Sequence, residues 1–287
     1  MITSRTATPP VLPILKWVGG KTRLLPTLTE LYGGQGHIIE PFFGGGALSF
    51  RLASTAATPL HVRANDALAP VVEIYEAVRA DVEGLIGQVD KYAGPYLALS
   101  TKEGRRAYYY AVRERYMRRE IDGPAPLLFM LRCAYSGMYR TGTTYPGRFN
   151  SSHGFGTEHA GFYQPDRLRA AAGLMQNWEF SSDDFAGCLP DVTADSFVLL
   201  DPPYRETYTG YTGDGFGPAD HLRVVEFFKA ADVRGAKVVY TNKDLGDGYY
   251  DEHFAGFHIQ RVPIRYQVNR DCATVGRPET FEVVVNN

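Results

Sequence analysis

The stretch Ser196-Phe197-Val198-Leu199-Leu200-Asp201-Pro202-Pro203-Tyr204 organises this sequence of 287 residues. Its first five residues form an apolar run without alternation, which predicts a strand buried on both faces of a parallel sheet. Pro202 and Pro203 then end the strand, because neither has an N–H group to donate to a neighbouring strand. A carboxylate, two fixed carbonyls and an aromatic ring therefore follow the carboxyl end of a buried strand, where open α/β sheets bind their ligands.

Asp201 to Tyr204 suit the transfer of a group to an amino nitrogen on a planar ring. Such a nitrogen is a poor nucleophile, because its lone pair is delocalised into the ring. The Asp201 carboxylate and the Pro202 carbonyl can each accept one of its N–H bonds and stabilise the positive charge that develops. The Tyr204 ring can stack on the base, which is worth roughly 1–3 kcal/mol. The same residues also suit an ordinary surface turn after a core strand.

The composition is that of a globular protein, with 44% hydrophobic and 22% charged residues. No apolar run reaches the roughly 20 residues that span a bilayer, and Met1–Pro10 lacks the apolar core of a signal peptide. The three cysteines are widely spaced, so we expect free thiols and a cytoplasmic protein without membrane contact. Neither they nor the seven histidines have ligand spacing, so we expect no metal. The formal charge of −2 still allows a local basic patch.

A glycine pair followed by a lysine indicates a first binding element. Leu15–Lys21 leads into a helical pattern, so free backbone N–H groups and the charge of Lys21 could hold an anionic group such as a carboxylate. Trp17 would supply a flat apolar wall. The alternative is a glycine turn with a core tryptophan and a solvated lysine.

Two strands with polar or glycine-rich ends complete a nucleotide-type site. His37–Pro41 reads as a strand that enters the glycine loop 42–47, where the backbone can approach a ligand closely. Residues 60–64 read as a second strand that ends near Asp66. That acid fits an acceptor for ribose hydroxyls, an N-cap of the next helix, or both.

Residues 69–117 and 126–133 have helical patterns, and 104–120 interleaves arginines with tyrosines. That segment suits a phosphate backbone or, equally, a solvated helix face paired with glutamates. The long loop Thr141–Gly161 is typical of a functional segment. After it come strands at 179–181, 196–200 and 237–240, helices at 162–175 and 220–231, and an antiparallel pair at 258–266 and 280–285. The sequence predicts an α/β fold with a mixed, mainly parallel sheet interrupted by a largely helical insert.

Four segments in this order resemble the motifs of the Dam-type DNA adenine-N6 methyltransferases of the alpha group, in which the cofactor loop comes first and Asp-Pro-Pro-Tyr last. They are Lys16–Lys21, Glu40–Gly46, Asn65–Asp66 and Asp201–Tyr204. Lesser matches are Tyr135–Arg140, Gly147–Asn150, Asp184–Phe185 and Thr241–Asp244. The likeness covers nearly the whole chain after Pro10.

The resemblance implies a Rossmann-like methyltransferase sheet, S-adenosylmethionine as methyl donor and double-stranded DNA as partner. The catalytic domain would be 11–68 with 162–287, and the target-recognition subdomain 69–161. Cofactor contacts would come from Trp17, Lys21, Phe43, Gly44, Gly45, Asp66, Asp184, Phe185 and Asp201. The catalytic residues would be Asp201, Pro202, Pro203 and Tyr204. DNA contacts would come from Arg132, Tyr135, Arg140, Arg148 and Asn150.

The implied reaction is methylation of N6 of an adenine that has left the duplex, at GATC or a related short site. The host would be a bacterial or phage-infected cell, and the enzyme a monomer, with a dimer as the alternative. Ser136 and Pro146 depart from the residues usual in GATC readers, so the departures concern the recognition sequence. Other candidates are RNA adenine or cytosine N4 as acceptor, and a catalytically inactive DNA-binding relative. Asp201 favours adenine over cytosine, and the intact Asp201–Tyr204 and Lys21 argue against the inactive relative.

Overall fold

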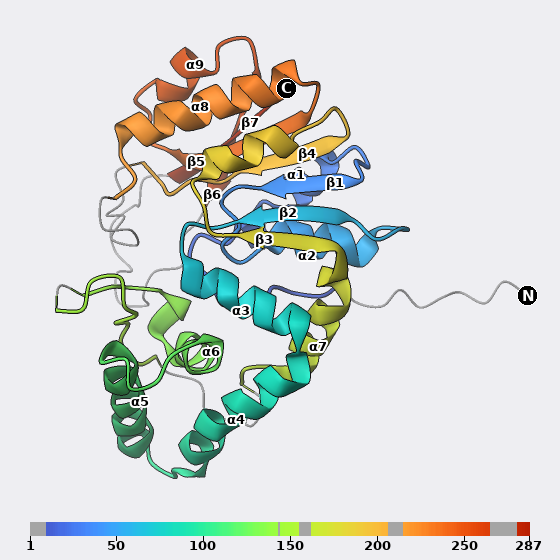
Figure 1. Ribbon diagram of the computed structural model, residues 1–287. Helices are drawn as coiled ribbons and strands as arrows, with labels where there is room; N and C mark the ends of the chain where they lie inside the picture. The colour runs from blue at the N-terminus through green and yellow to red at the C-terminus, as the bar shows by residue number, and fades with distance from the viewer. Residues whose placement is uncertain (1–9, 143, 155–161, 206–214, 265–279) are drawn as a thin grey trace, which may run out of the picture.

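A computed structural model of the protein describes residues 10–142, 144–154, 162–205, 215–264 and 280–287 (Figure 1). The strands are β1 His37–Glu40, β2 His61–Asn65, β3 Trp178–Ser181, β4 Ser196–Leu200, β5 Lys237–Asp244, β6 His258–Ile264 and β7 Thr280–Asn286. The α-helices are α1 Leu25–Leu31, α2 Ala47–Thr55, α3 Ala69–Ala80, α4 Val82–Ala98, α5 Lys102–Met117, α6 Pro124–Cys133, α7 Pro165–Leu174, α8 Pro218–Val233 and α9 Tyr249–His253. Short 3-10 helices are η1 Lys21–Arg23, η2 Tyr135–Gly137, η3 Met175–Asn177 and η4 Phe185–Asp191.

The strands form one sheet in the order β3-β2-β1-β4-β5-β7-β6. The pairs from β3 to β5 are parallel, whereas β7 runs antiparallel to both β5 and β6. The predicted mainly parallel sheet and the predicted terminal antiparallel pair are therefore confirmed. From β1 the chain moves outward to β2 and β3, and from β4 it moves the other way to β5. The strand order reverses between β1 and β4, which is where a doubly wound sheet opens a crevice.

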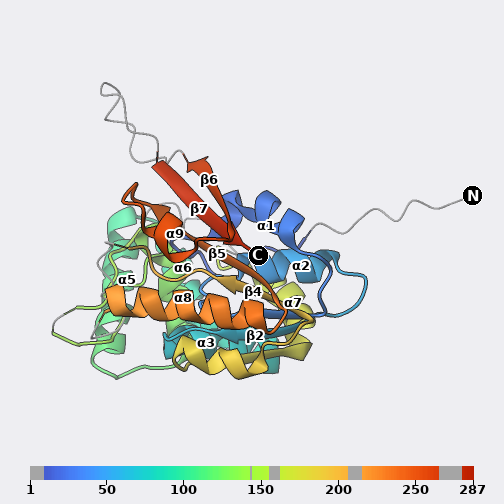
Figure 2. The same cartoon turned by 90° about the horizontal axis from the view of Figure 1, so that it is seen from above.

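Both faces of the sheet are covered, which explains the uninterrupted apolar run in β4. Phe197 and Leu199 belong to the core on the side of α1 and α2, whereas Val198 and Leu200 belong to the core on the side of α8. Figure 2 shows α8 on the opposite side of the strands from α1 and α2. A strand that packs on both sides needs no polar face.

The strand β5 extends four residues beyond the predicted end at Tyr240. The extension pairs with the start of β7, with Lys243 opposite Glu282 and Asp244 opposite Phe281. These hydrogen bonds come from a strand far along the chain, so local propensity could not indicate them. The pairing fixes Thr241 and Asn242 in the sheet beside the end of β4.

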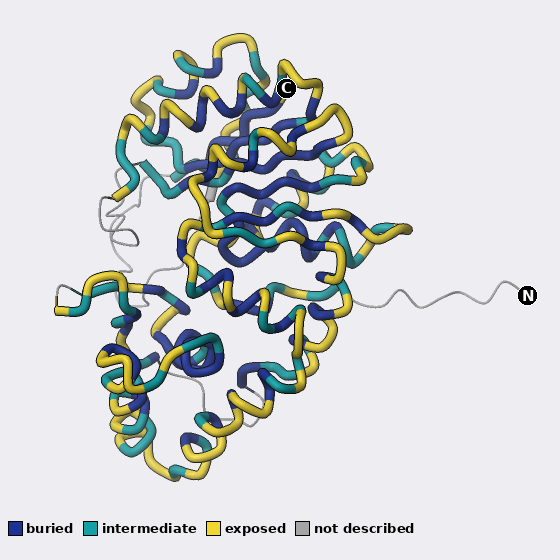
Figure 3. The backbone as a smooth tube through the Cα atoms, viewed as in Figure 1, coloured by how far each residue is buried: buried dark blue, intermediate teal, exposed yellow. Residues whose placement is uncertain are grey.

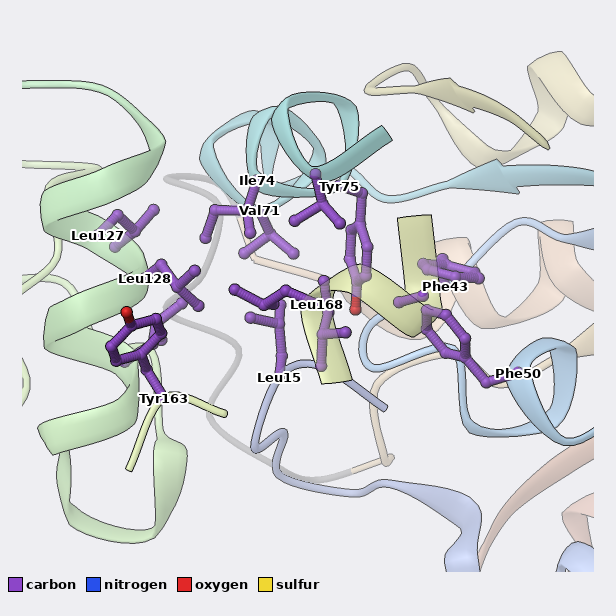
Figure 4. Packing of buried hydrophobic residues seen from close by; sticks show 14 of the residues in the cluster. Leu15, Phe43, Phe50, Val71, Ile74, Tyr75, Leu127, Leu128, Tyr163 and Leu168 are labelled. Atoms are coloured by element: carbon purple, nitrogen blue, oxygen red, sulfur yellow. The ribbon is translucent and has the colours of Figure 1, made fainter. Parts of the chain in front are cut away.

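The helices α4, α5 and α6 form the insert, and α3 joins it to the sheet (Figure 1). Tyr75 of α3 stacks on Phe180 of β3, with ring centroids 5.5 Å apart. Figure 4 shows side chains of α3 and α7 between Phe43 and Phe50 on one side and Leu127 and Leu128 of α6 on the other. One continuous core therefore links the sheet to the insert, and α3, which lies inside the range predicted for the insert, packs on β3 as well as on α6 and α7.

The segment with alternating arginines and tyrosines forms most of α5, and its two faces differ. Tyr109 and Tyr116 are buried against the rest of the insert, whereas Arg106 and Arg119 are exposed. Figure 3 shows this division, with buried positions toward the centre and exposed ones along the outer faces of α4 and α5. Within the described ranges, no helix combines the length and the apolar content needed to cross a lipid bilayer.

Candidate active site

A crevice of about 550 Å³ opens at the carboxyl ends of β1 and β4. The segments that line it include 17–21, 40–48, 65–68, 183–185 and 201–204. All nine predicted cofactor contacts and all four predicted catalytic residues are among its lining residues. The sequence segments that suggested a site thus meet at one place in the fold.

The glycine loop after β1 is shaped to receive Trp17. Gly44 has a φ of 48°, and a Cβ added there would lie 2.7 Å from Trp17 Nε1. A Cβ on Gly45 would lie 3.1 Å from Trp17 Cβ. The hydroxyl of Tyr75 donates to the Gly44 carbonyl at 2.8 Å, which fixes the loop from below. Glycine is therefore needed because the indole packs directly against the backbone.

Phe43 contributes its backbone to the crevice and its side chain to the core. Only 4% of the residue is exposed, and its ring lies 5.0 Å from Tyr75 and 6.5 Å from Phe50 (Figure 4). Its amide donates to the carbonyl of Asn65 at 2.8 Å, which ties the loop to the end of β2. The ring thus supports the floor of the crevice from the core.

Asp66 combines the two roles that the sequence left open. Its carboxylate accepts from the Leu68 amide at 2.9 Å, just before α3, and from the Gly44 amide at 2.8 Å. Burial raises the pKa of Asp66, and these two backbone bonds act against that rise. Each carboxylate oxygen can accept more than one bond. The acid therefore still has acceptor capacity toward the crevice that it lines.

The far wall of the crevice is aromatic and charged. The ring of Phe185 lies 5.0 Å from Phe42 and 6.1 Å from Phe216. Asp184 accepts from Arg223 at 2.5 Å, and the Arg223 guanidinium lies 4.7 Å from the Phe185 ring centroid. Phe42, Phe216 and Arg223 were not among the predicted site residues. Phe42 stands in the glycine loop 42–47 that the sequence indicated, whereas Phe216 precedes α8 and Arg223 lies on it.

At the end of β4, Asp201 is held by two partners. Lys21 Nζ lies 2.7 Å from Asp201 Oδ1, and the Thr241 hydroxyl donates to the same oxygen at 3.0 Å. Burial raises the pKa of Asp201 above its ordinary value, and Lys21 and Thr241 act against that rise. Lys21, predicted to meet an anionic group, is buried and bound to this carboxylate in the structure.

The corner Asp201–Tyr204, which follows β4, is also held by side chains of β5 and β7. Asn242 Nδ2 donates to the carbonyls of Pro202 and Pro203 at 3.2 and 3.3 Å. The Tyr204 hydroxyl donates to Glu282 Oε1 at 2.8 Å, and Lys21 Nζ donates to that hydroxyl at 3.4 Å. Thr241 and Asn242 belong to a segment that the sequence singled out without a role. Glu282 was missed, and its only signal was an acid in an otherwise apolar run.

A second buried acid lies at the end of β1. Glu40 accepts from the amide and the hydroxyl of Ser49, at 3.0 and 2.5 Å. Burial raises the pKa of Glu40 to about 7, and the negative charge of Asp201 contributes to the rise. The site therefore contains three carboxyl groups with raised pKa values, Asp66, Asp201 and Glu40, of which only Asp201 follows the end of β4.

Two of the predicted DNA contacts are engaged inside the protein. Arg132 binds the carbonyl of Phe162 at 2.7 Å and that of Ile14 at 3.5 Å, and burial lowers its pKa to about 10. Arg148 pairs with Asp122 at 3.1 Å and lies 4.0 Å from the ring of Tyr116. Arg132 thus ties α6 to segments outside the insert, and Arg148 bonds a residue within it, while both remain predicted DNA contacts.

The other three lie around a hairpin of the insert. Antiparallel bridges join Ala134 to His153 and Thr141 to Phe149. Tyr135 and Arg140 are exposed. The backbone N–H of Asn150 donates to the backbone carbonyl of Arg140 at 2.6 Å. Residues 143 and 155–161 of the predicted loop lie outside the described residues.

The hairpin also contacts the first binding element. Gly137 has a φ of 66°, and a Cβ there would lie 2.1 Å from the Lys16 carbonyl oxygen. Ser136, next to it, has a φ of 54°. The short helix η2, on the first arm of the hairpin, thus packs against the segment that carries Trp17 and Lys21.

Comparison with known proteins shows the family of this chain. Residues 17–267 match the model of the D12 class N6 adenine-specific DNA methyltransferases. The chain belongs to this family. The Dam-type resemblance, the methyltransferase fold and the adenine-specific DNA methyltransferase activity predicted from the sequence are thereby confirmed.

Relatives of similar length support the same family. The chain is 30% identical to the type II methyltransferase M.MjaIII of Methanocaldococcus jannaschii over 275 residues, which cover 90% of this chain and 93% of that one. It is 26% identical to the type II methyltransferase M1.LlaDCHI of Lactococcus lactis subsp. cremoris, with 96% and 95% covered. It is 25% identical to the DNA adenine methylase of Haemophilus influenzae, with 90% and 88% covered.

Proposed function

We propose that this D12 class enzyme transfers the methyl group of S-adenosylmethionine to N6 of an adenine flipped out of duplex DNA at a short specific site. The observation that carries the proposal is the shared crevice. Asp201, Pro202 and Tyr204 line the same cavity as the glycine loop and Asp66. A donor and an acceptor bound there would lie side by side.

The crevice fits the proposed methyl donor by shape and by chemistry. Its volume lies within the range of roughly 300–1,000 Å³ that is common for small-molecule sites. Gly44 and Gly45 let Trp17 form a flat wall, Asp66 offers acceptors to ribose hydroxyls, and Phe185 lines the cavity where the adenine ring would lie. When bound, the donor supplies a methyl group activated by its sulfonium sulfur.

Lys21 limits how a donor carboxylate can be held. Its ammonium bonds Gly19 O at 3.2 Å, Asp201 Oδ1 at 2.7 Å and Tyr204 Oη at 3.4 Å. An ammonium has three N–H groups, so all of its donors have a partner. A carboxylate that binds Lys21 must therefore replace one of these contacts, and the longest one, to Tyr204, is the weakest.

The protein's own part in the reaction is to bind and orient the amine. Asp201 and the Pro202 carbonyl each accept one N6–H bond, which favours a tetrahedral nitrogen and stabilises the charge that forms on it. Asn242 uses one lone pair of the Pro202 carbonyl and leaves a second for the adenine. Tyr204 stacks on the base. The amine can lose its proton after attack, so no strong base is required.

The insert would supply the contacts with the duplex. Extrusion of a base costs a few kcal/mol. The protein must offset this cost with contacts to the DNA backbone and to the gap that the base leaves in the stack. Arg140 and Tyr135 on the hairpin, and the exposed arginines of α5, are suited to phosphate and base contacts. The packing of Gly137 on Lys16 brings this surface next to the cofactor segment.

The test is a labelled-methyl assay on matched substrates. The protein is incubated with methyl-labelled S-adenosylmethionine and duplex DNA, and separately with RNA of the same sequence; the products are digested and separated as nucleosides. We expect N6-methyldeoxyadenosine from the duplex alone. Label in RNA alone or at cytosine N4 would overturn the proposal, and label in neither would indicate an inactive relative.

A further inference from the structure

The Tyr204 ring is held at its tip by a residue from a different part of the chain. Its hydroxyl donates to Glu282 Oε1 at 2.8 Å. Glu282 lies on β7, which pairs with β5 and not with β4, so this bond reaches across β5 to the corner that follows β4. The two residues are 78 positions apart in sequence.

The setting of Glu282 suggests that it does more than complete a strand. Only 5% of the residue is exposed, and it precedes the buried run Val283–Val285. Burying a carboxylate is unfavourable unless it is hydrogen-bonded, and Tyr204 supplies one such bond to Glu282. Glu282 therefore lies at the edge of the core, and its carboxylate is bonded to Tyr204, one of the predicted catalytic residues.

Glu282, Thr241 and Asp201 lie on the same side of the sheet. By strand alternation, Glu282 and Thr241 share the face of Val284 and Val239, and Asp201, which follows β4, continues the face of Leu199. In the register of β5 and β7, Thr241 lies opposite Val284 and Glu282 opposite Lys243. Lys21 Nζ lies 4.8 Å from the centre of the Tyr204 ring. Tyr204 is therefore fixed both by Glu282 and by Lys21.

We infer that Glu282 is a positioning residue, which holds the phenol of Tyr204 so that its ring is ready to stack on the extruded adenine. This inference rests on the proposed function. A phenol ring turns about two side-chain bonds. A hydrogen bond at its tip restricts rotation about Cα–Cβ, and because a phenol O–H prefers the plane of the ring, the direction of that bond also biases rotation about Cβ–Cγ. Lys21 cannot provide this restraint throughout the reaction, because a donor carboxylate competes for it. Glu282 keeps the ring oriented when that exchange occurs, so the stacking surface is preorganised.

The experiment compares Glu282→Leu, Glu282→Gln, Tyr204→Phe and the double variant Tyr204→Phe/Glu282→Leu. The matched control is Asn286→Ala, which alters another buried polar residue of β7 whose side chain accepts from Lys237. Each protein is assayed for kcat and KM on duplex DNA and for S-adenosylmethionine affinity by calorimetry. Emission of 2-aminopurine at the target position reports stacking, since a stacked base is quenched.

We expect Glu282→Leu and Tyr204→Phe each to lower kcat roughly tenfold, as loss of a hydrogen bond to a charged group does. The double variant should fall no further, because both changes break the same bond. Both single variants should brighten 2-aminopurine in the complex, and Glu282→Leu should do so without changing S-adenosylmethionine affinity. Glu282→Gln, whose amide oxygen can still accept, should restore most activity, and Asn286→Ala should match the wild type.

Wild-type kcat and emission in Glu282→Leu would overturn the inference, as would multiplying losses in the double variant. Should Glu282→Leu fail to fold, a wild-type kcat in Tyr204→Phe has the same meaning. If the wild type itself makes no N6-methyladenine, the proposed function fails and the inference fails with it. The two failures are thus distinguishable in one set of assays.

Discussion

Replacing Asp201 by alanine should reveal the strength of its ion pair with Lys21 as well as its part in methyl transfer. At 2.7 Å and an effective dielectric constant of about 20, the gross attraction is about 6 kcal/mol. The Lys21 side chain is 5% exposed and that of Asp201 20%, so desolvation offsets much of this attraction. The variant leaves a buried ammonium with Gly19 O and Tyr204 Oη as partners. We expect a loss of about 3 kcal/mol, at the low end for a broken buried pair.

The assay is a double-mutant cycle of Asp201→Ala, Lys21→Met and the double variant, followed by chemical and thermal unfolding without cofactor. Asp201→Ala should lower the melting temperature by roughly 5–10 °C. The double variant should recover most of that loss, because neither charge of the pair is left buried without its partner. Methyl transfer should fall at least about 100-fold in Asp201→Ala and should not return in the double variant, since the acceptor for N6–H is still missing.

Two results would refute this reasoning. If Asp201→Ala and the double variant were equally stable, Lys21 and Asp201 would not be coupled in the folded protein. If the double variant regained methyl transfer along with stability, the loss in Asp201→Ala would reflect damage to the fold and not a missing acceptor.

Three further predictions follow from the other parts of the crevice and the insert. Burial raises the pKa of Glu40 to about 7, so its contribution to stability is fully present below its unfolded pKa and is lost as the pH rises through about 7. Between about pH 5 and pH 8, the free energy of unfolding of Glu40→Gln should therefore rise by about 2–3 kcal/mol relative to that of the wild type in denaturant titrations. Equal differences between variant and wild type at both pH values would contradict the burial argument. Gly44→Ala puts a Cβ 2.7 Å from Trp17 Nε1 at a positive φ and should weaken S-adenosylmethionine binding roughly tenfold by calorimetry, whereas Gly173→Ala, which meets open space, should not; equal affinities would show that the loop can yield. Arg140→Ala should leave stability within about 0.5 kcal/mol and lower the salt dependence of DNA binding by about one counterion, and an unchanged salt slope would place this arginine off the duplex.

Much of the crevice could be predicted because its parts are local in sequence. The run Ser196–Tyr204 contains both the buried strand and the residues that end it. The glycine loop after β1 and the acid after β2 likewise follow their own strands. Since the carboxyl ends of parallel strands meet at one edge of a sheet, finding the strands was enough to bring these groups together.

The partners within the site could not be predicted, because they depend on distant contacts. Arg132 lies in a helical pattern, and nothing local shows that its guanidinium reaches the carbonyls of Ile14 and Phe162. The pairing of Glu282 with Tyr204 depends on the antiparallel return of β7, which also lengthened β5. An apolar helix face shows that α3 is buried but not that it packs on β3.

The most direct test of the central claim is methylation-sensitive sequencing of DNA from cells that lack their own methyltransferases and express this protein. It reports the modified base and its context together, and Asp201→Ala expressed to the same level serves as control. We predict N6-methyladenine at one short recurring site with the wild type and none with the variant. Methylated cytosine in place of adenine, or equal adenine methylation by the variant, would contradict the assignment of this corner as the site of methyl transfer.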